Sequence, residues 1–336
     1  MAEARLSVLD LSPIASGSTA SEALQHTLDL ARHTEALGYE RYWLAEHHNA
    51  GSLASSAPEI MIGQVAAATR TIRVGAGGIM LPNHSPLKVA ELFRVLHALF
   101  PDRIDLGLGR AAGTDPRTAV ALRGSRHALA VDDFPEQMAE LVRYLEEDAT
   151  PRSAFTTSIR AIPLGVPAPV LWILGSTDYG ASYAAAHGYG FAFAHHINPG
   201  DALHALRAYR AHFRPSARLA EPRTILAVSA LCAETESEAD DLRASADLST
   251  LRFASGLRDL PMPSVAEARA HVWDDDARAL LEANRGRTFV GTPGHVRHRV
   301  LGLAREAQAD EVMIMSNIHD HGARKRSYEL LATALR

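Results

Sequence analysis

The stretch IRVGAGGIMLPNHSPLKVAELFRVLHALFPDRIDLGLG, residues 72–109, contains one complete strand–helix–strand unit. Residues 72–81 and 103–109 are short and mostly apolar, which is typical of parallel strands that are buried on both faces. Residues 85–100 between them have the spacing of a helix, with Pro86 in the first turn, where proline is favoured. The stretch therefore predicts two parallel strands joined by a crossover helix.

The same alternation extends from this unit in both directions along the chain. Eight apolar runs predict strands, and a helical pattern follows each of them. The predicted strands are residues 6–12, 39–46, 72–81, 103–109, 169–175, 190–196, 223–233 and 311–317. Eight such units in 336 residues predict an α/β fold, the (β/α)8 TIM barrel, in preference to an open doubly wound sheet. We expect residues 1–336 to form one TIM-barrel domain.

Two segments in the last third of the chain depart from this pattern. Residues 251–285 have no clear periodicity and predict an irregular insertion. Met262, Trp273 and two prolines within it could cover an apolar substrate, so the insertion is a candidate active-site lid, and a simple surface insertion is the alternative. Residues 289–296, FVGTPGHV, predict a loop that leads into a helix beginning with proline.

Composition narrows the class of protein. The formal charge of −5 and the pI near 6.4 give no sign of a nucleic acid or an anionic membrane as a partner. Cys232 is the one cysteine, which excludes an internal disulfide and fits a reducing cytoplasm. The first residues do not resemble a signal peptide, and no run approaches the ~18 apolar residues of a transmembrane helix. We therefore expect a cytoplasmic protein.

Polar clusters follow several of the predicted strands. TIM-barrel enzymes carry their working residues at the carboxyl ends of the strands, so these clusters are the candidate functional residues. They are Glu46-His47-His48, Gly109-Arg110, Gly175-Ser176-Thr177, His195-His196 and Ser316-Asn317.

The adjacent histidines His47 and His48 suggest a metal site at first sight. Successive side chains of a strand point to opposite faces, so two adjacent histidines cannot easily bind one ion. We therefore expect no metal site and disfavour a metal hydrolase. One of the two histidines, more readily His48 than His47, could be a satisfied core or rim residue.

Three glycine-containing motifs leave alternatives open. GLGRAAG, residues 107–113, fits a loose dinucleotide fingerprint, but the loop that follows lacks the required helix, which leaves Arg110 as an anion-binding or a solvated cation. The glycines of residues 74–78 suit either a planar ligand against the backbone or tight barrel packing. Ser176 and Thr177 suit either an anion site at a helix start or ordinary capping.

Taken together, the motifs resemble one family, the bacterial luciferase-like flavin-dependent monooxygenases. The resemblance covers nearly the whole chain except about residues 251–285, and it is closest to non-luminescent single-chain members, several of which act in natural-product biosynthesis. The motifs that carry it are GYERYWLAEHHN, IRVGAGGIMLPNHSPLKVAE, RIDLGLGRAAGTDP, LWILGSTDYGASYAAAHGYGFAFAHH and DEVMIMSNIHDHGARKRSYELLA.

The resemblance implies a TIM barrel that binds reduced FMN (FMNH2) and lets it react with O2. The resulting C4a-peroxyflavin would hydroxylate or epoxidise a small organic metabolite, and a separate NAD(P)H-flavin reductase would supply the FMNH2. Family members are often homodimers through the helices beside the second and third strands, and residues 59–68 are apolar enough for such a contact.

The resemblance also implies roles for individual residues. His47 matches the histidine that supports the oxygen chemistry, and Gly77 and Gly78 match a pair joined by a non-prolyl cis peptide beside the flavin ring. Among the further matches, Arg110, Ser176 and Thr177 would hold the phosphate, and His195 would lie near the flavin ring. Gly180 stands where the family usually has a hydroxyl residue, so only its backbone amide could contribute.

Two other functions remain compatible with the same motifs. One is a deazaflavin (F420)-dependent oxidoreductase, which transfers hydride on the same barrel without using O2. The other is a flavin-binding protein without turnover.

Overall fold

The computed structural model describes residues 4–125, 133–146 and 159–336. The strands are β1 (Arg5–Asp10), β2 (Arg41–Leu44), β3 (Arg73–Met80), β4 (Ile104–Gly109), β5 (Val170–Gly175), β6 (Gly190–Ala194), β7 (Thr224–Cys232), β8 (Thr288–Gly291) and β9 (Glu311–Met315). The α-helices are α1 (Ala20–Ala36), α2 (Pro58–Ala68), α3 (Pro86–Leu99), α4 (Pro116–Arg123), α5 (Phe134–Leu145), α6 (Asp178–His187), α7 (Ala202–His212), α8 (Glu236–Ala254), α9 (Val265–Ala270), α10 (Asp275–Asn284), α11 (Pro293–Glu306) and α12 (His321–Leu335). Two short 3-10 helices are η1 (Leu81–Asn83) and η3 (Arg285–Arg287).

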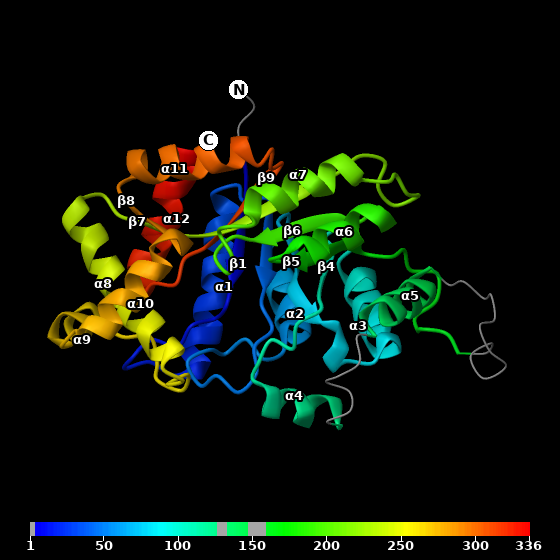
Figure 1. The fold of residues 1–336 in the computed structure, drawn as a ribbon. Helices are drawn as coiled ribbons and strands as arrows, with labels where there is room; N and C mark the ends of the chain where they lie inside the picture. The colour runs from blue at the N-terminus through cyan, green and yellow to red at the C-terminus, as the bar shows by residue number, and fades with distance from the viewer. Residues whose placement is uncertain (1–3, 126–132, 147–158) are drawn as a thin grey trace.

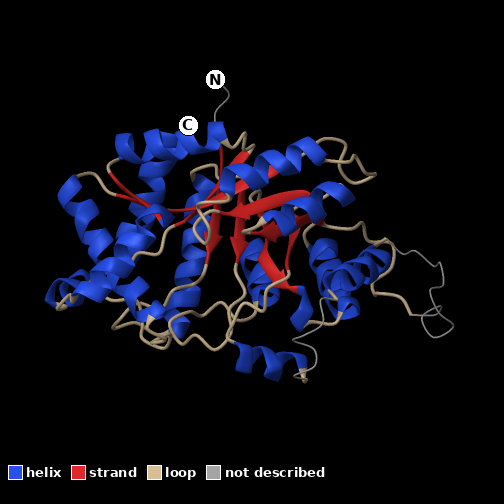
Figure 2. Cartoon of the chain, viewed as in Figure 1, coloured by secondary structure: helices blue, strands red, loops and turns tan. Residues whose placement is uncertain are grey.

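Eight of these strands form a closed parallel barrel in the order β1-β2-β3-β4-β5-β6-β7-β9. Pairing of β9 with β1 closes the ring. The strands lie at the centre of the molecule with helices around them (Figure 1, Figure 2). They are the eight strands predicted from the sequence, with bounds that differ by at most two residues. The predicted TIM barrel is therefore confirmed.

Alternation along the strands separates two layers of core. In β2, Tyr42 and Leu44 belong to the large cluster between the barrel and its helices, whereas Trp43 packs inside the barrel. The inner cluster also contains Leu9 of β1 and Trp172 of β5. Because side chains alternate in direction along a strand, this assignment extends to the residues that follow each strand and decides which of them face the barrel mouth.

Two of the predictions for the last third differ from the structure, although the predicted helix that begins with proline is present as α11 from Pro293. Residues 288–291 form the strand β8, which pairs only with Ser229–Cys232 at the end of β7 and lies outside the ring. Residues 251–285 are largely helical, since they contain the end of α8, then α9 and α10. Ser264 and Asp274 cap the starts of α9 and α10 with their side chains, which stabilises short helices that have little apolar periodicity.

The segment 258–262 before α9 ties the insertion to the loops at the carboxyl end of the barrel. The Met262 amide donates to the Ile14 carbonyl at 2.8 Å, after β1. The Gly51 amide donates to the Asp259 carboxylate at 3.0 Å, after β2. The insertion therefore lies beside the barrel mouth, at the end opposite the two termini (Figure 1). In the part of the chain that the structure describes, no helix has the length and apolarity that crossing a bilayer requires.

Candidate functional site

His47 follows β2 at the carboxyl end of the barrel. Trp43 and Ala45 pack inside the barrel, so alternation along the strand places His47 on the same side, in the mouth. Its backbone amide donates to the Ser55 carbonyl at 2.9 Å, which fixes the turn. The sequence prediction that His47 and His48 point apart agrees with this geometry, because His48 turns instead toward Glu46.

The His47 imidazole is half-buried and uncharged at neutral pH. Burial lowers its pKa below the ordinary histidine value, and the opposing attraction of the Glu46 carboxylate is the smaller effect. Its Nδ1 atom is buried and has no hydrogen-bond partner among the described residues. A buried polar atom without a partner is uncommon and needs an explanation, such as a bound molecule. The His47 Nδ1 atom is thus a neutral donor or acceptor that can hydrogen-bond a bound molecule.

The Glu46 side chain links the end of β2 to the end of β3 through hydrogen bonds. Its side chain is 2% exposed, and its Oε1 atom bonds His48 Nε2 at 2.8 Å and His84 Nε2 at 2.9 Å. Its Oε2 atom accepts the Met80 amide at 2.8 Å, at the end of β3. Burial alone would raise the Glu46 pKa, but the bonds from His84 and His48 hold it below the ordinary value. Glu46 therefore orients the loop that carries His47 relative to β3.

This contact predicts a change in the titration of His84. The hydrogen bond to the Glu46 carboxylate raises the His84 pKa against the effect of burial, so Glu46→Gln should lower it to the ordinary value or below. An NMR titration of the histidine ring protons measures the shift. An unaltered His84 curve in the variant would refute the coupling.

Gly77 and Gly78 lie in the middle of the register shift between β3 and β4, and the peptide bond between them is cis. A Cβ atom at Gly77 would lie 2.8 Å from Leu9 Cδ1, and one at Gly78 would lie 2.7 Å from the Gly107 carbonyl oxygen. Both glycines are therefore required by packing inside the barrel, which was one of the two sequence interpretations. Their place beside a flavin ring stays a prediction.

The exits of β4 and β5 bring Arg110 to the start of α6. The Arg110 Cζ atom lies 3.9 Å from the centre of the Tyr179 ring, in the first turn of α6. Ser176 and Thr177 form the turn between β5 and α6, and the Thr177 side chain makes no capping bond to the helix. The amides of a helix start attract anions, and here a guanidinium and two hydroxyls lie next to them. The three predicted residues thus come together.

Gly180 occupies the third position of α6 and is buried. A Cβ atom there would lie 3.2 Å from Phe191 Cε2 and 3.3 Å from the Gly175 Cα atom. The helix can approach β5 this closely because the residue is glycine. A side chain at this position would face the barrel wall and not the turn, whereas the Gly180 amide is one of the first helical amides, which lack a partner within the helix.

The two histidines after β6 point in different directions. The His195 ring stacks on Phe289 of β8, with centroids 5.3 Å apart. His196 Nδ1 donates to the Ala227 carbonyl at 3.2 Å, and the His196 pKa is lowered to about 4 by burial and by the proximity of His47. Alternation from Ala192, which packs inside the barrel, also places His196 in the mouth. The family resemblance implied that His195 lies near the flavin ring, whereas alternation along β6 indicates His196 for this position.

The carboxyl mouth carries a further buried atom that lacks a partner within the described residues. It is Asn317 Oδ1 after β9, in addition to His47 Nδ1 after β2. His195 Nδ1 after β6 also lacks a partner there, but its ring stacks on β8, and alternation places it away from the mouth. Two unsatisfied atoms at the ends of two strands fit a polar cofactor or substrate bound across the mouth. In the described ranges, no three His, Cys, Asp or Glu side chains gather as they would around a metal ion.

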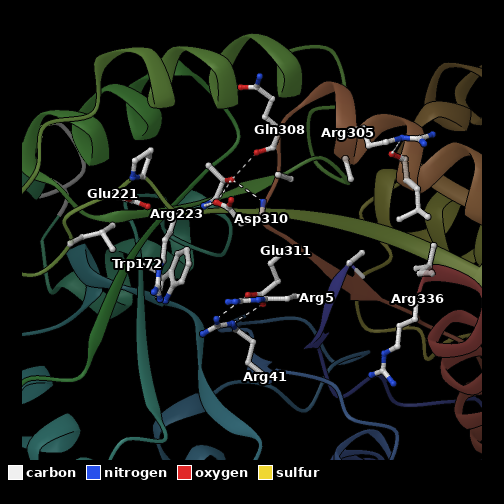
Figure 3. A pocket seen from close by; sticks show the side chains of 18 of the residues that line it. Arg5, Arg41, Trp172, Glu221, Arg223, Arg305, Gln308, Asp310, Glu311 and Arg336 are labelled. Atoms are coloured by element: carbon white, nitrogen blue, oxygen red, sulfur yellow. Dashed lines mark hydrogen bonds and ion pairs between the residues drawn. The ribbon is translucent and has the colours of Figure 1, made fainter. Parts of the chain in front are cut away.

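A cavity of about 940 Å³ lies at the opposite, amino end of the barrel (Figure 3). Its floor contains Arg41, which bonds Glu311 at 2.7 Å and Asp105 at 2.8 Å. The amino end of a TIM barrel generally serves stability, and these charges are mutually satisfied. We therefore assign no catalytic function to this cavity.

Residues 4–311 match the protein family described as luciferase-like monooxygenase. A luciferase-like monooxygenase of Escherichia coli K12 is 43% identical over 328 residues, which cover 96% of this chain and 95% of that protein. N-acetyl-S-alkylcysteine monooxygenase of Bacillus subtilis 168 is 34% identical over 98% of both chains. The crystal structure of apo-MsnO8 has a TM-score of 0.88 at 40% identity and covers 99% of this chain and 98% of that one.

The fold is shared with enzymes that use another cofactor. An F420-dependent secondary alcohol dehydrogenase has a TM-score of 0.70 at 12% identity, over 99% of both chains. At this identity the likeness concerns the fold alone.

Proposed function

The chain belongs to the luciferase-like monooxygenase family, and we propose that it uses reduced FMN and O2 to oxygenate a small organic metabolite. The observation that carries this proposal is the arrangement at the carboxyl mouth. A neutral His47, whose Nδ1 atom has no partner among the described residues, lies at one side of the barrel, and a turn suited to an anion, with Arg110 beside it, lies at the ends of β4 and β5. A flavin has a polar ring system at one end and a phosphate at the other.

Each predicted site residue has a place in this proposal. The phosphate would be held by Arg110, by Ser176 and Thr177, and by the first amides of α6, including that of Gly180. The ring would lie near β3 with Gly77 and Gly78, within reach of His47. His195 stays a prediction, and the geometry favours its neighbour His196 for contact with the ring.

The flavin, when bound, would supply the oxygen chemistry, and the protein would supply position and exclusion of water. The insertion 251–285 supports the second task, because its backbone already bonds the loops after β1 and β2. We propose that it acts as the lid of the site. Met262, which is 4% exposed, would be part of its inner surface.

The reaction would be hydroxylation, epoxidation or another oxygenation, in natural-product biosynthesis or in the metabolism of a small compound. The relative that oxygenates an N-acetyl-S-alkylcysteine makes such thioethers the first substrates to test. A separate NAD(P)H-flavin reductase would supply the reduced FMN, and this supply would place the reaction in the cytoplasm.

Anaerobic titration with FMNH2 and with reduced F420, followed by absorbance and calorimetry, tests the choice of cofactor. We expect FMNH2 to bind, and its reoxidation by O2 to yield an oxygenated product with a suitable substrate. Binding of F420 with hydride transfer, in place of FMNH2, would establish the rival oxidoreductase. FMNH2 binding without oxygenation of any compound in a broad substrate panel would favour a binding protein.

We also propose that the protein is a homodimer through α2 and α3. Ile60 of α2 is 62% exposed, and Val95 and Leu99 of α3 are 46% and 65% exposed. Val95 and Leu99 are four residues apart, so they share one face of the helix. Exposed apolar side chains that gather on neighbouring helices are typical of a protein interface.

The double variant Ile60→Asp, Leu99→Asp should therefore convert a dimer into a monomer, because two carboxylates would have to be buried without partners. Analytical ultracentrifugation would show the mass falling from twice to once the 36.2 kDa of the chain. Val272→Asp is the matched control, since Val272 is 88% exposed but lies in the insertion. A wild-type protein that sediments as a monomer would refute the proposal.

A further inference from the structure

We infer that Tyr179 is a positioning residue that directs Arg110 toward the phosphate of the cofactor. The inference rests on the proposed function, because it assumes that Arg110 binds this phosphate. Arg110 is exposed and follows β4 directly, whereas Tyr179 is half-buried in the first turn of α6. The guanidinium lies over the ring, with Cζ 3.9 Å from the ring centre. This distance is well within the range of a cation–π contact.

The Tyr179 ring is itself held by other aromatic rings. It stacks on Tyr183, one helical turn further along α6, with 10° between the planes and 6.4 Å between centroids. Tyr183 in turn stacks on His187 at 4.3 Å and meets the edge of the buried Phe134 of α5 at 5.5 Å. The place of the Tyr179 ring is therefore set by α5 and α6 and does not depend on Arg110.

The contact joins the two halves of the proposed phosphate site. Arg110 comes from the end of β4, and Ser176 and Thr177 come from the turn after β5. A free arginine side chain samples many rotamers, and ordering it on binding costs entropy. A guanidinium already stacked next to the start of α6 has lost much of this freedom, so it binds a phosphate there more tightly.

This role depends on the ring of Tyr179 and not on its hydroxyl group. Tyr179→Leu removes the π face, whereas Tyr179→Phe keeps it and removes only the hydroxyl. The role also depends on the phosphate, which FMN has and riboflavin lacks. The two variants and two ligands therefore separate positioning of Arg110 from direct hydrogen bonding by Tyr179 and from general packing of α6.

The experiment is anaerobic calorimetric titration with FMNH2 and with reduced riboflavin, for wild type, Tyr179→Leu, Tyr179→Phe, Arg110→Ala and Arg110→Ala/Tyr179→Leu. We expect Tyr179→Leu to weaken FMNH2 binding about 3- to 10-fold and to leave riboflavin binding unchanged. Tyr179→Phe should stay close to wild type. Tyr179→Leu should have no further effect once Arg110 is absent, since it acts through Arg110.

Several results would overturn the inference. They are equal weakening of both flavins by Tyr179→Leu, an equal loss in Tyr179→Phe, and a full loss in the Arg110→Ala background. A wild-type protein that does not prefer FMNH2 over reduced riboflavin would overturn the proposed phosphate site and this inference together. A clear wild-type preference that Tyr179→Leu retains would overturn the positioning role alone.

Discussion

His47→Ala should lower the rate of oxygenation by about 100-fold or more, which is the ordinary contribution of a positioned acid–base or hydrogen-bonding side chain. The fold should survive the change. Within the part of the chain that the structure describes, the Nδ1 atom of His47 has no hydrogen-bond partner, and the backbone bond to Ser55 does not involve the side chain. The imidazole is also neutral at neutral pH because burial lowers its pKa, so no buried ion pair is broken.

The rate of oxygenation is measured with a compound from the substrate panel, and a second measurement requires no substrate. Protein loaded with FMNH2 is mixed with O2, and flavin reoxidation is followed by absorbance, with released hydrogen peroxide assayed alongside. We expect the variant to reoxidise the flavin with an altered rate and to release peroxide more rapidly. His48→Gln is the control, because the His48 side chain bonds Glu46 and strand alternation after β2 directs it away from the mouth. Identical kinetics in His47→Ala and wild type would remove His47 from the mechanism.

The barrel strands were predictable because burial on both faces leaves a strong signal. A parallel strand inside a ring of helices is a short apolar run, and eight such runs were visible. The strand β8, TFVG, was missed because it pairs along about half of one neighbour, and because Gly291 at its end and Pro293 just after it indicate a loop. Its position depends on β7, which is distant in sequence.

The helices of the insertion were missed for a different reason. Helices α9 and α10 are short and bury only one and two residues, so they lack the periodicity of a core helix. Their starts nevertheless carried a signal that was overlooked. Ser264 and Glu267 form a capping box, a pattern that can be read directly from the sequence.

Strand alternation predicted the separation of His47 from His48, and applied to β6 it would also have favoured His196 over His195. The partners of Glu46 could not be predicted in this way. His84 is 38 residues from Glu46 along the chain, and only the pairing of β2 with β3 brings them together. The stacking of Arg110 on Tyr179 likewise depends on the pairing of β4 with β5. Contacts between strands are properties of the barrel and not of any local motif.

The second large effect is expected at the amino end of the barrel. Arg41→Met should lower the free energy of unfolding by about 3–5 kcal/mol, because it removes one partner from a buried ionic network. Arg41 is 4% exposed, and its partners Asp105 and Glu311 are 0% and 3% exposed. The Trp43 indole also donates to Asp105 at 3.0 Å, and Arg73 pairs with its other oxygen at 2.6 Å.

The loss of stability in Arg41→Met comes from the buried carboxylate that is left without its cation, and not only from the lost attraction between the opposite charges. Without Arg41, Asp105 keeps Arg73, but Glu311 keeps only the hydroxyl of Ser7 among its side-chain contacts in the described residues. A carboxylate buried in this way must either stay charged without a cation or take up a proton. The double variant Arg41→Met/Glu311→Met removes both charges and should recover part of the lost stability, in spite of carrying two substitutions.

Urea unfolding monitored by circular dichroism compares these variants with Arg5→Met. Arg5 is the matched control, because it lines the same cavity at the start of β1 but is exposed (Figure 3). Its replacement should change the free energy of unfolding by about 0.5 kcal/mol or less. If Arg41→Met costs no more than Arg5→Met, the buried charges do not stabilise the barrel. If the double variant is less stable than Arg41→Met, the loss comes from packing in the barrel floor and not from the unpaired carboxylate.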